Sequence, residues 1–154
     1  MTIKIRQSIK ADLPKLLEFE QGVIHAERPF DNQLKPDPIT YYDLVNLIDS
    51  EEAEVLVAED DGNIIASGYA LIKQSKPYLK SSKQSYLGFM YVEPGYRGQR
   101  INQLIVEGLI DWSRSKDVYE IILDVYDGNM AAIRAYEKAG FKKNLIQMRL
   151  NLDE

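Results

Sequence analysis

The sequence predicts an α+β domain with a mixed sheet, and three observations carry this prediction. Its 154 residues are 45% apolar and 28% charged, which is typical of one globular domain with its own core. Segments with strand alternation and segments with helical periodicity follow one another in the order β-α-α-β-β-β-α-β-α-β. A strand–helix–strand crossover lies between residues 85 and 125.

The first 50 residues predict one strand, two helices and a long loop. Alternating apolar and charged residues predict a strand over residues 2–8. Asp12 is typical of a helix start, and the helical periodicity after it continues to about Gly22. Three prolines predict a loop over residues 23–39, and long loops in compact domains are often functional. Thr40 is predicted to cap a second, short helix.

The middle of the chain predicts a hairpin and a further strand. An apolar run begins at Val55, and the turn sequence Asp61-Gly62-Asn63 leads into a strand over residues 64–73. A polar, lysine-rich stretch separates this hairpin from a strand predicted over residues 85–92. These segments supply the three consecutive strands in the predicted order.

The last third of the chain predicts two helices and two strands. Residues 119–125 are nearly all apolar, as expected of a central strand that is covered on both faces. Asn129 begins the last helix and Gly140 ends it, and alternation over residues 145–152 predicts a closing strand. The helix that follows residue 100 carries one apolar stripe, formed by Ile101, Leu104, Ile105, Gly108, Leu109 and Trp112.

The segment from Tyr91 to Asn102 predicts a site for an anion. An apolar strand ends there, and a loop with Arg97, Gly98 and Arg100 leads directly into the amphipathic helix. Backbone N–H groups at a helix start lack internal partners and lie at the positive end of the helix dipole, so they favour an anion. The arginines add charge, and the glycine lets a phosphate approach the backbone. The alternative is an ordinary strand-to-helix connection with solvated arginines.

Composition and missing motifs exclude several functions. No Gly-Lys-Ser/Thr ending is present, and Gly95 and Gly98 lie too late in the chain for a dinucleotide fingerprint. The net charge of −5 argues against broad binding to nucleic acid or anionic membranes. Without cysteine there is no disulfide or thiol nucleophile, and no spacing of His, Asp and Glu supports a metal site. We expect a cytoplasmic protein, because neither a signal peptide nor a membrane-length apolar run is present.

Two motifs with defined spacing lie in the second half of the chain. The first has the lead-in Val92-Glu93-Pro94-Gly95-Tyr96 followed by Arg97-Gly98. The second, residues 129–141, reads Asn, x, x, Ala, three residues, Tyr, x, Lys, x, Gly-Phe. Together they resemble the pyrophosphate loop and the second signature of the GCN5-related N-acetyltransferase (GNAT) superfamily. The first departs from the family pattern at Arg100, where glycine is usual, and at Asn102, where glycine or alanine is usual.

The resemblance implies one GNAT domain over residues 1–154. Its fold is a mostly antiparallel sheet of six to seven strands with about four helices, in which strands 85–92 and 119–125 splay apart at the coenzyme A cleft. The implied activity is direct transfer of an acetyl group from acetyl-CoA to a primary amine. The acceptor is a small or polyamine-like molecule, a protein N-terminus or a lysine. A non-catalytic acyl-CoA sensor or scaffold on the same fold is the alternative, which Arg100 favours.

The predicted contacts with coenzyme A come from both motifs and from the strand before the first one. The resemblance implies that amides at the strand edge pair with the pantetheine arm, and that the loop holds the diphosphate. The contact residues are Met90, Tyr91, Val92, Arg97, Gly98, Gln99, Arg100, Ile101, Asn102, Asn129, Ala132, Tyr136 and Lys138.

Tyr136 and Asp124 are the predicted catalytic residues. Asn129 and Tyr136 are seven residues apart and share one face of a helix, so a ligand along that face could contact both. By the resemblance, Asn129 binds the pantetheine arm, Tyr136 protonates the departing thiolate, and Asp124 is a candidate base for the ammonium. The alternatives are an N-cap for Asn129, a core aromatic for Tyr136 and a structural carboxylate for Asp124.

His25, Glu27, Asp31 and Tyr41 are predicted to contact the acceptor amine. The superfamily forms its acceptor pocket from the first two helices and the loop between them, and acidic residues there suit a cationic amine. A solvated polar loop is the alternative for any one of these residues. The expected partners are acetyl-CoA and an amine, without nucleic acid, membrane or metal. The oligomeric state is open, and a homodimer is one expectation because superfamily members often dimerise through their C-terminal strands.

Overall fold

The computed structural model describes residues 2–153. These residues form two compact units that divide between Asp124 and Val125. The first unit contains the sheet and the helices up to Ser115, and the second contains the last helix and the C-terminal segment. The single domain predicted over residues 1–154 stays a prediction.

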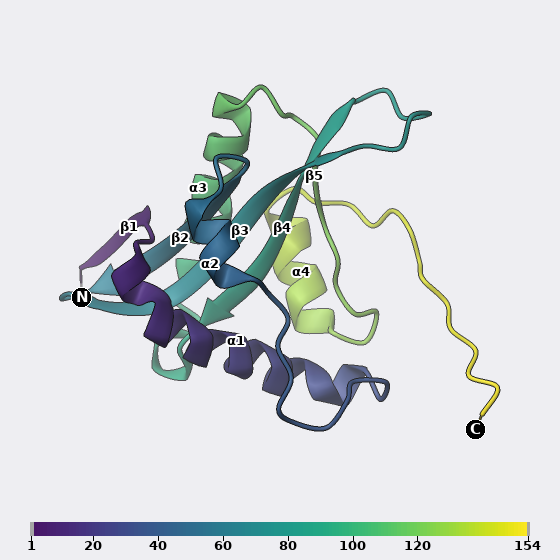
Figure 1. Cartoon of the computed structure of the whole chain (residues 1–154), viewed down its shortest axis with the longest axis horizontal. Helices are drawn as coiled ribbons and strands as arrows, with labels where there is room; N and C mark the ends of the chain where they lie inside the picture. The colour runs from purple at the N-terminus through teal and green to yellow at the C-terminus, as the bar shows by residue number, and fades with distance from the viewer. Residues whose placement is uncertain (1, 154) are drawn as a thin grey trace. The chain divides into compact units, whose positions relative to one another are not determined.

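A five-stranded mixed sheet forms the centre of the first unit (Figure 1). Its strands lie in the same order in space as in the sequence. Neighbouring strands are antiparallel, except that β4 and β5 are parallel and are joined through a helix, as the predicted crossover requires. The strands are β1 (Ile3–Gln7), β2 (Ala53–Asp60), β3 (Asn63–Gln74), β4 (Lys83–Val92) and β5 (Ile121–Leu123).

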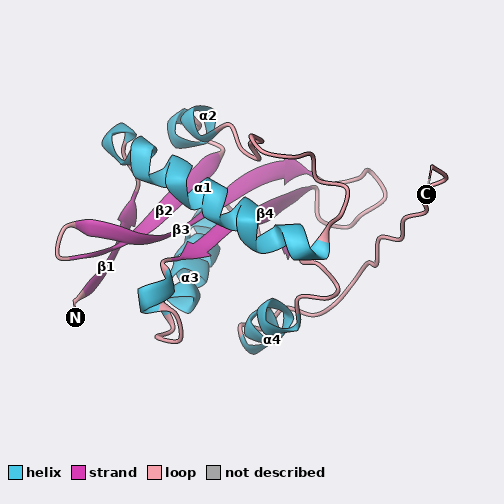
Figure 2. Cartoon of the chain, turned by 90° about the horizontal axis from the view of Figure 1, so that it is seen from below, coloured by secondary structure: helices cyan, strands magenta, loops and turns pink. Residues whose placement is uncertain are grey.

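Helices cover both faces of this sheet (Figure 2). On one face, α1 (Leu13–Glu27) and α2 (Leu44–Asp49) pack on the strands through an apolar core. On the other face, α3 (Ile101–Ser115) approaches so closely that a side chain at Gly68 of β3 would collide with Ile105. The core under α1 and α2 includes Leu16, Phe19, Val55, Val57, Tyr69 and Phe89.

The first two helices differ from their predicted bounds. The helix predicted to end near Gly22 continues to Glu27, because Val23 and Ile24 are buried and extend its apolar stripe. The predicted loop from residue 23 is therefore wrong over its first five residues, and His25 and Glu27 lie on α1. The cap predicted at Thr40 is also wrong. Asp43 caps α2, and its side chain accepts a hydrogen bond from the Asn46 N–H at 3.2 Å.

The strand count is lower than predicted. Five strands are present among residues 2–153, where six to seven were expected. The central strand predicted over residues 119–125 pairs only over Ile121–Leu123. The segment 145–152 forms no strand, because its alternation supplies an apolar side but no neighbouring strand pairs with it. Its apolar side chains are 79–89% exposed: Leu145, Ile146, Met148, Leu150 and Leu152.

The second unit is built around α4 (Met130–Lys138). Asn129 caps this helix, and its side-chain oxygen accepts a hydrogen bond from the Ala132 N–H at 3.3 Å. Gly140 follows with a φ of +104°, a conformation that glycine adopts readily. Both predicted ends of the last helix are confirmed. Among the residues described, none of the helices has the length and apolar character that crossing a bilayer requires.

Candidate active site

The predicted site begins at a bulge in β4. Tyr69 of β3 pairs with Gly88, but Ser67 pairs with Tyr91, so Phe89 and Met90 both stand opposite Gly68. Phe89 has a φ of +58°, which is rare for a bulky residue and is held here by its burial in the core. The extra residue reverses which side of the strand each later backbone group faces.

Beyond the bulge, β4 has an edge that no strand of the first unit covers. The pairing of β4 with β5 ends at Leu87 and Leu123, whereas β4 continues to Val92. The two parallel strands therefore separate after Leu87, as expected from the resemblance. Along residues 88–92, the edge of β4 opposite β3 has no strand of the first unit beside it. We call this the free edge.

The hydrogen bonds of β4 show which groups the free edge presents. The Phe89 carbonyl accepts a hydrogen bond from the Ser67 hydroxyl of β3 at 3.1 Å, so the N–H on the same peptide, that of Met90, points away from β3. The Glu93 N–H donates to the Ile65 carbonyl at 2.8 Å, so the Val92 carbonyl also points away. In an extended strand the N–H and C=O of one residue share a side. The free edge thus presents the amides of Met90 and Val92.

The loop after β4 has the backbone that the predicted phosphate site needs. A turn over Pro94–Tyr96 is tied to β2, because the Tyr96 hydroxyl donates to Asp60 at 2.7 Å. Gly98 has a φ of +80°, and a side chain at this position would meet nothing within 4 Å. Arg100 has a φ of +63° and a ψ of 17°, so this non-glycine residue adopts the left-handed conformation directly before α3.

The N-terminus of α3 carries no side-chain cap. Arg100 occupies the cap position without accepting a hydrogen bond from the first turn. The first N–H groups of this 15-residue helix are therefore open to an anionic ligand. Ile101 contributes only its backbone, since its side chain is buried, while Asn102 is half-buried.

The arginines and the glutamine of the loop lie at its surface. Arg97 donates from Nε to the Val92 carbonyl at 2.9 Å, and its guanidinium lies 5.8 Å from the centre of the Tyr91 ring. The Tyr91 ring itself packs on Phe19 of α1, so it belongs to the core side of the sheet. Gln99 and Arg100 are exposed. Arg97 thus fastens the loop to the end of β4, and Arg100 is the exposed guanidinium next to the start of α3.

The predicted acceptor residues lie at the C-terminal end of α1 and after it. His25 is exposed on α1, whereas Asp31 is buried, and its side chain accepts a hydrogen bond from the Gln33 N–H at 3.0 Å. Burial raises the pKa of Glu27, and the charge of Asp31 acts in the same direction. A hydrogen bond from Tyr41 acts in the opposite direction and lowers this pKa. The structure therefore brings Glu27, Asp31 and Tyr41 together and leaves His25 at the surface.

Asp124, the predicted base, lies one residue beyond β5 at the end of the first unit. Its carboxylate accepts a hydrogen bond from the Tyr86 hydroxyl at 3.0 Å, and its side chain is exposed. This hydrogen bond links the end of β5 to β4, and the role of Asp124 as a base stays a prediction. Burial raises the pKa of Tyr86 well above its usual range, and the charge of Asp124 acts in the same direction.

Sequence reasoning missed three residues of this region. Glu20 of α1 is 1% exposed, and one of its oxygens accepts hydrogen bonds from the N–H groups of Tyr41 and Tyr42 at 2.9 and 2.7 Å. Tyr69 and Tyr86 lie side by side with ring centres 6.4 Å apart. A charged residue on the apolar stripe of α1 was the available signal for Glu20. The tyrosines gave none, because alternating aromatic residues are ordinary in strands.

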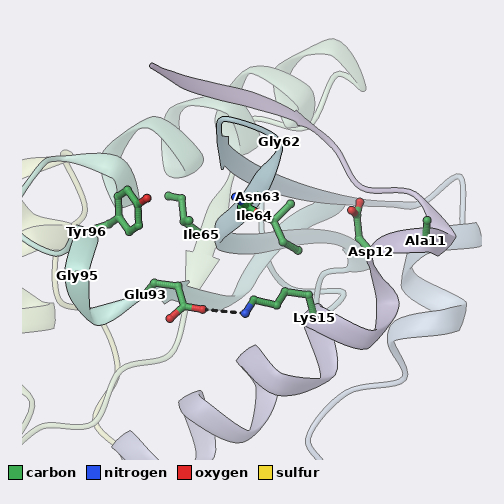
Figure 3. A pocket seen from close by; sticks show the side chains of 10 residues that line it. All are labelled: Ala11, Asp12, Lys15, Gly62, Asn63, Ile64, Ile65, Glu93, Gly95 and Tyr96. Atoms are coloured by element: carbon green, nitrogen blue, oxygen red, sulfur yellow. Dashed lines mark ion pairs between the residues drawn. The ribbon is translucent and has the colours of Figure 1, made fainter. Parts of the chain in front are cut away.

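A pocket of about 480 Å³ lies on the β3 side of the segment after β4 (Figure 3). Lys15 of α1 and Glu93 form an ion pair across it at 3.5 Å. The Glu93 N–H points toward β3, so this pocket lies on the other side of the chain from the free edge. Neither the loop residues 97–102 nor the predicted acceptor residues line it.

The remaining predicted residues belong to the second unit. Capping by Asn129 uses the side-chain oxygen and leaves the two amide N–H groups for another partner. Tyr136 is half-buried and packs edge-on against Phe141, with ring centres 5.9 Å apart. Ala132 lies in the first turn of α4, and Lys138 is exposed in its last turn. Asn129 therefore acts as a helix cap, and Tyr136 is a packed aromatic residue. Their predicted roles toward coenzyme A stay predictions.

The comparison with known families gives a single family. The model of the acetyltransferase (GNAT) family matches residues 20–141, which include the whole of the loop after β4 and α4. The chain belongs to the GNAT acetyltransferase family. Members of this family use acetyl-CoA as co-substrate, and this GNAT protein is accordingly an acetyl-CoA-dependent N-acetyltransferase.

Individual relatives and solved structures agree with this assignment. A glucosamine 6-phosphate N-acetyltransferase from Trypanosoma brucei brucei is 29% identical over 75% of this chain and 79% of its own length. A tetramutant of a Bacillus halodurans protein has a similar structure, with a TM-score of 0.86 and 25% identity over 97% of this chain and 99% of its own. A Clostridium acetobutylicum protein solved with acetyl-CoA has the same fold, with a TM-score of 0.77 and 20% identity over 98% and 97% of the chains.

The residues of the GNAT site fit acetyl-CoA. The free edge presents backbone amides suited to the amides of a pantetheine arm. The uncapped start of α3, with open space over Gly98, suits a diphosphate. Among residues 2–153, no group of three or more His, Asp or Glu side chains could hold a metal ion.

Proposed function

We propose that this GNAT protein transfers the acetyl group of acetyl-CoA directly to a primary amine. The acceptor classes are a small or polyamine-like amine, a protein N-terminus and a lysine side chain. The free edge of β4 beside the uncapped start of α3 is the single observation that carries the proposal. The backbone amides of the free edge suit the pantetheine arm of coenzyme A, and the start of α3 suits its diphosphate.

The binding roles follow from these groups. The amides of Met90 and Val92 pair with the pantetheine arm, and Tyr91 supports this edge from the core side. The N–H groups of residues 98–102 hold the diphosphate, with Arg100 as an additional cation. In the second unit, the amide of Asn129 is assigned to the pantetheine arm. Ala132 and Lys138 remain proposed contacts by resemblance.

The chemical roles are assigned to groups that the family resemblance and the free edge suggest. Acetyl-CoA supplies an acetyl group activated as a thioester. A backbone N–H of the free edge near Val92 polarises the carbonyl oxygen that gains negative charge in the transition state. Asp124 or water accepts a proton from the acceptor ammonium, and Tyr136 protonates the departing thiolate. We further propose that the protein acts in the cytoplasm.

Two measurements test the function. Calorimetry with acetyl-CoA measures binding, and a thiol-reactive dye then measures release of free coenzyme A in the presence of an amine and peptide panel. Saturable binding followed by amine-dependent thiol release supports transfer. Binding without thiol release under any amine would favour the sensor or scaffold, for which the exposed Arg100 at a usual glycine position is the motivating observation. Absence of binding would contradict both functions.

A further inference from the structure

A cluster of aromatic rings lies on the α1 and α2 face of the sheet, next to the free edge. Tyr42 is at its centre, with ring centres 5.6 Å from Tyr41, 5.6 Å from Tyr69 and 5.0 Å from Phe89. Tyr86 extends the cluster along β4 through its contact with Tyr69. We call these five residues the tyrosine cluster. It is built from the segment before α2 and from β3 and β4, so residues far apart in the sequence meet here.

Tyr69 directs a polar group to the point where the free edge begins. The residue is only 7% exposed, yet its hydroxyl has no hydrogen-bond partner within residues 2–153. A side chain on Gly88 would lie 2.8 Å from this hydroxyl oxygen, so the phenol rests directly on the Gly88 backbone. Gly88 is the first residue of β4 beyond its last pair with β5. A hydroxyl with unused hydrogen-bonding capacity, on a residue that is 7% exposed, therefore lies at the start of the free edge.

Two carboxylates contact the tyrosine cluster: Asp124 accepts a hydrogen bond from the Tyr86 hydroxyl at 3.0 Å, and Glu27 accepts one from Tyr41. Besides burial, the charge of Asp124 raises the pKa of Tyr69 and Tyr86. After burial and the neighbouring Tyr69, the charge of Glu27 raises the pKa of Tyr42. Neither Asp124 nor Glu27 forms an ion pair in the part of the chain that the structure describes. The cluster thus lies beside two carboxylates that have no ion-pair partner within 4.0 Å among the described residues.

The cluster already contacts one ammonium group. Nζ of Lys73, on β3, lies 4.2 Å from the centre of the Tyr86 ring. At this distance the negative face of the ring attracts the cation. Aromatic faces together with carboxylates that lack a counter-ion are the usual protein surroundings of a bound ammonium.

We propose that the acceptor of this GNAT protein is a small molecule with two cationic nitrogens, of the diamine or polyamine class. This inference rests on the proposed transfer to an amine. The reacting nitrogen lies against the Tyr69 hydroxyl and Gly88, on the Asp124 side of the cluster. The second nitrogen remains an ammonium and is held by Glu27 and the ring faces. In the transfer, the reacting nitrogen first passes a proton from its ammonium form to Asp124 or water, and a C–N bond then forms as the C–S bond breaks. The new amide nitrogen loses a second proton, and the departing thiolate takes up a proton to leave as the free thiol.

The test compares three amines as acceptors in the thiol-release assay. They are 1,4-diaminobutane, n-butylamine, which has the same carbon chain without the second nitrogen, and glucosamine 6-phosphate. We expect kcat/KM for the diamine to exceed that for n-butylamine by at least about tenfold, roughly the contribution of one desolvated ammonium contact. Equal values, or a preference for the sugar phosphate, would overturn the inference while leaving acetyl transfer intact.

Variants locate the second ammonium. Glu27→Gln keeps the shape of the side chain and is expected to raise KM for the diamine about tenfold, without change for n-butylamine. Glu18→Gln is the matched control, because Glu18 lies on the same helix and faces solvent. Tyr69→Phe removes only the hydroxyl and is expected to lower kcat/KM for both amines. A loss in Glu27→Gln that is the same for both amines would overturn the assignment of Glu27.

A binding measurement separates this inference from the proposed function. Calorimetry with 1,4-diaminobutane is carried out in the presence of coenzyme A, which cannot donate an acetyl group. Diamine binding that Glu27→Gln abolishes, without thiol release from any amine, would support the cation site and contradict transfer. Thiol release from n-butylamine, without measurable diamine binding, would support transfer and contradict the cation site.

Discussion

Replacing Glu20 is predicted to loosen the acceptor side of the site without touching a ligand. The Glu20 carboxylate is 1% exposed, and a single oxygen accepts the N–H groups of Tyr41 and Tyr42. It therefore ties the segment before α2 to α1. Without this tie, the backbone that carries two rings of the tyrosine cluster loses its anchor, and two buried donors lose their charged partner.

The size of the effect follows from these two hydrogen bonds. A hydrogen bond to a charged group contributes about 1.5–3 kcal/mol, and one between neutral groups about 0.5–1.5 kcal/mol. Glu20→Gln replaces two hydrogen bonds to a charged group by two between neutral groups. This lowers the free energy of unfolding by about 2 kcal/mol. For a chain of this length that corresponds to a fall in Tm of roughly 4–8 °C. Glu20→Ala leaves both N–H groups without a partner, at a cost of about 4 kcal/mol.

Urea unfolding followed by circular dichroism at pH 7 measures the change. Glu18→Gln, on the exposed side of the same helix, is the control and should stay within about 0.5 kcal/mol of the wild type. The urea midpoint should shift without a change in slope, because the exposed area on unfolding is the same. If Glu20→Gln and Glu20→Ala both unfold like the control, the carboxylate does not anchor this segment and the reasoning fails. Glu20→Gln should also raise KM for the amine acceptor.

Three further predictions concern other parts of the protein. Tyr136→Phe should lower kcat about 10²–10⁴-fold with acetyl-CoA affinity retained by calorimetry, and unchanged turnover would remove Tyr136 as general acid. The hydrogen bonds from Arg6 lower the pKa of Asp12, so this pair stabilises the fold above about pH 4 and loses its effect as the pH falls through the lower pKa of the folded state. Asp12→Asn should therefore flatten the acid side of a plot of unfolding free energy against pH, and an unchanged slope would contradict the assignment. Arg100 has a φ of +63°, so Arg100→Gly should be more stable than Arg100→Ala by about 1 kcal/mol in urea, and the reverse order would speak against the left-handed conformation.

The elements that periodicity defines well were predicted well from the sequence. The stripe of α3 is buried at Ile101, Ile105 and Leu109, and the turn at residues 61–63 joins β2 and β3 as expected. These features depend on neighbours three or four residues away, or on the intrinsic preference of Asp and Gly for turns. Leu104, predicted on the same stripe, is 41% exposed, because it lies at the border of the buried face.

Features that depend on distant partners could not be predicted in the same way. The bulge in β4 is defined by the register against β3, and nothing in the sequence around Phe89 announces a residue with positive φ. The segment 145–152 shows the reverse case, since its alternation is clear but no neighbouring strand pairs with it. The free edge was expected only through the family resemblance. Its residues Met90 and Val92 are placed there by the bulge, which reverses the direction of every later amide.

The departure at Arg100 has a physical explanation in the backbone. Glycine is usual at this position, and the observed φ of +63° and ψ of 17° belong to the region that glycine enters without steric cost. This chain therefore places a guanidinium on a backbone that glycine could also adopt. Because α3 has no side-chain cap, this charge lies beside unpaired N–H groups, where an anion would meet both. The residue that departs from the family pattern thus has a backbone conformation that the usual glycine would adopt without steric cost.

The charges around the tyrosine cluster do not favour a sugar phosphate as the acceptor, although this chain is similar to proteins named glucosamine 6-phosphate N-acetyltransferases. A sugar phosphate is an anion and needs cationic partners, whereas Asp124 and Glu27 flank this cluster without a counter-ion among residues 2–153. Members of one fold differ in acceptor through the residues that surround a common centre. Shared loops can therefore identify the donor of the acetyl group, while the charge beside the free edge selects the acceptor. On this reasoning we propose a cation without a phosphate group as the acceptor, although a similar protein is named for a sugar phosphate.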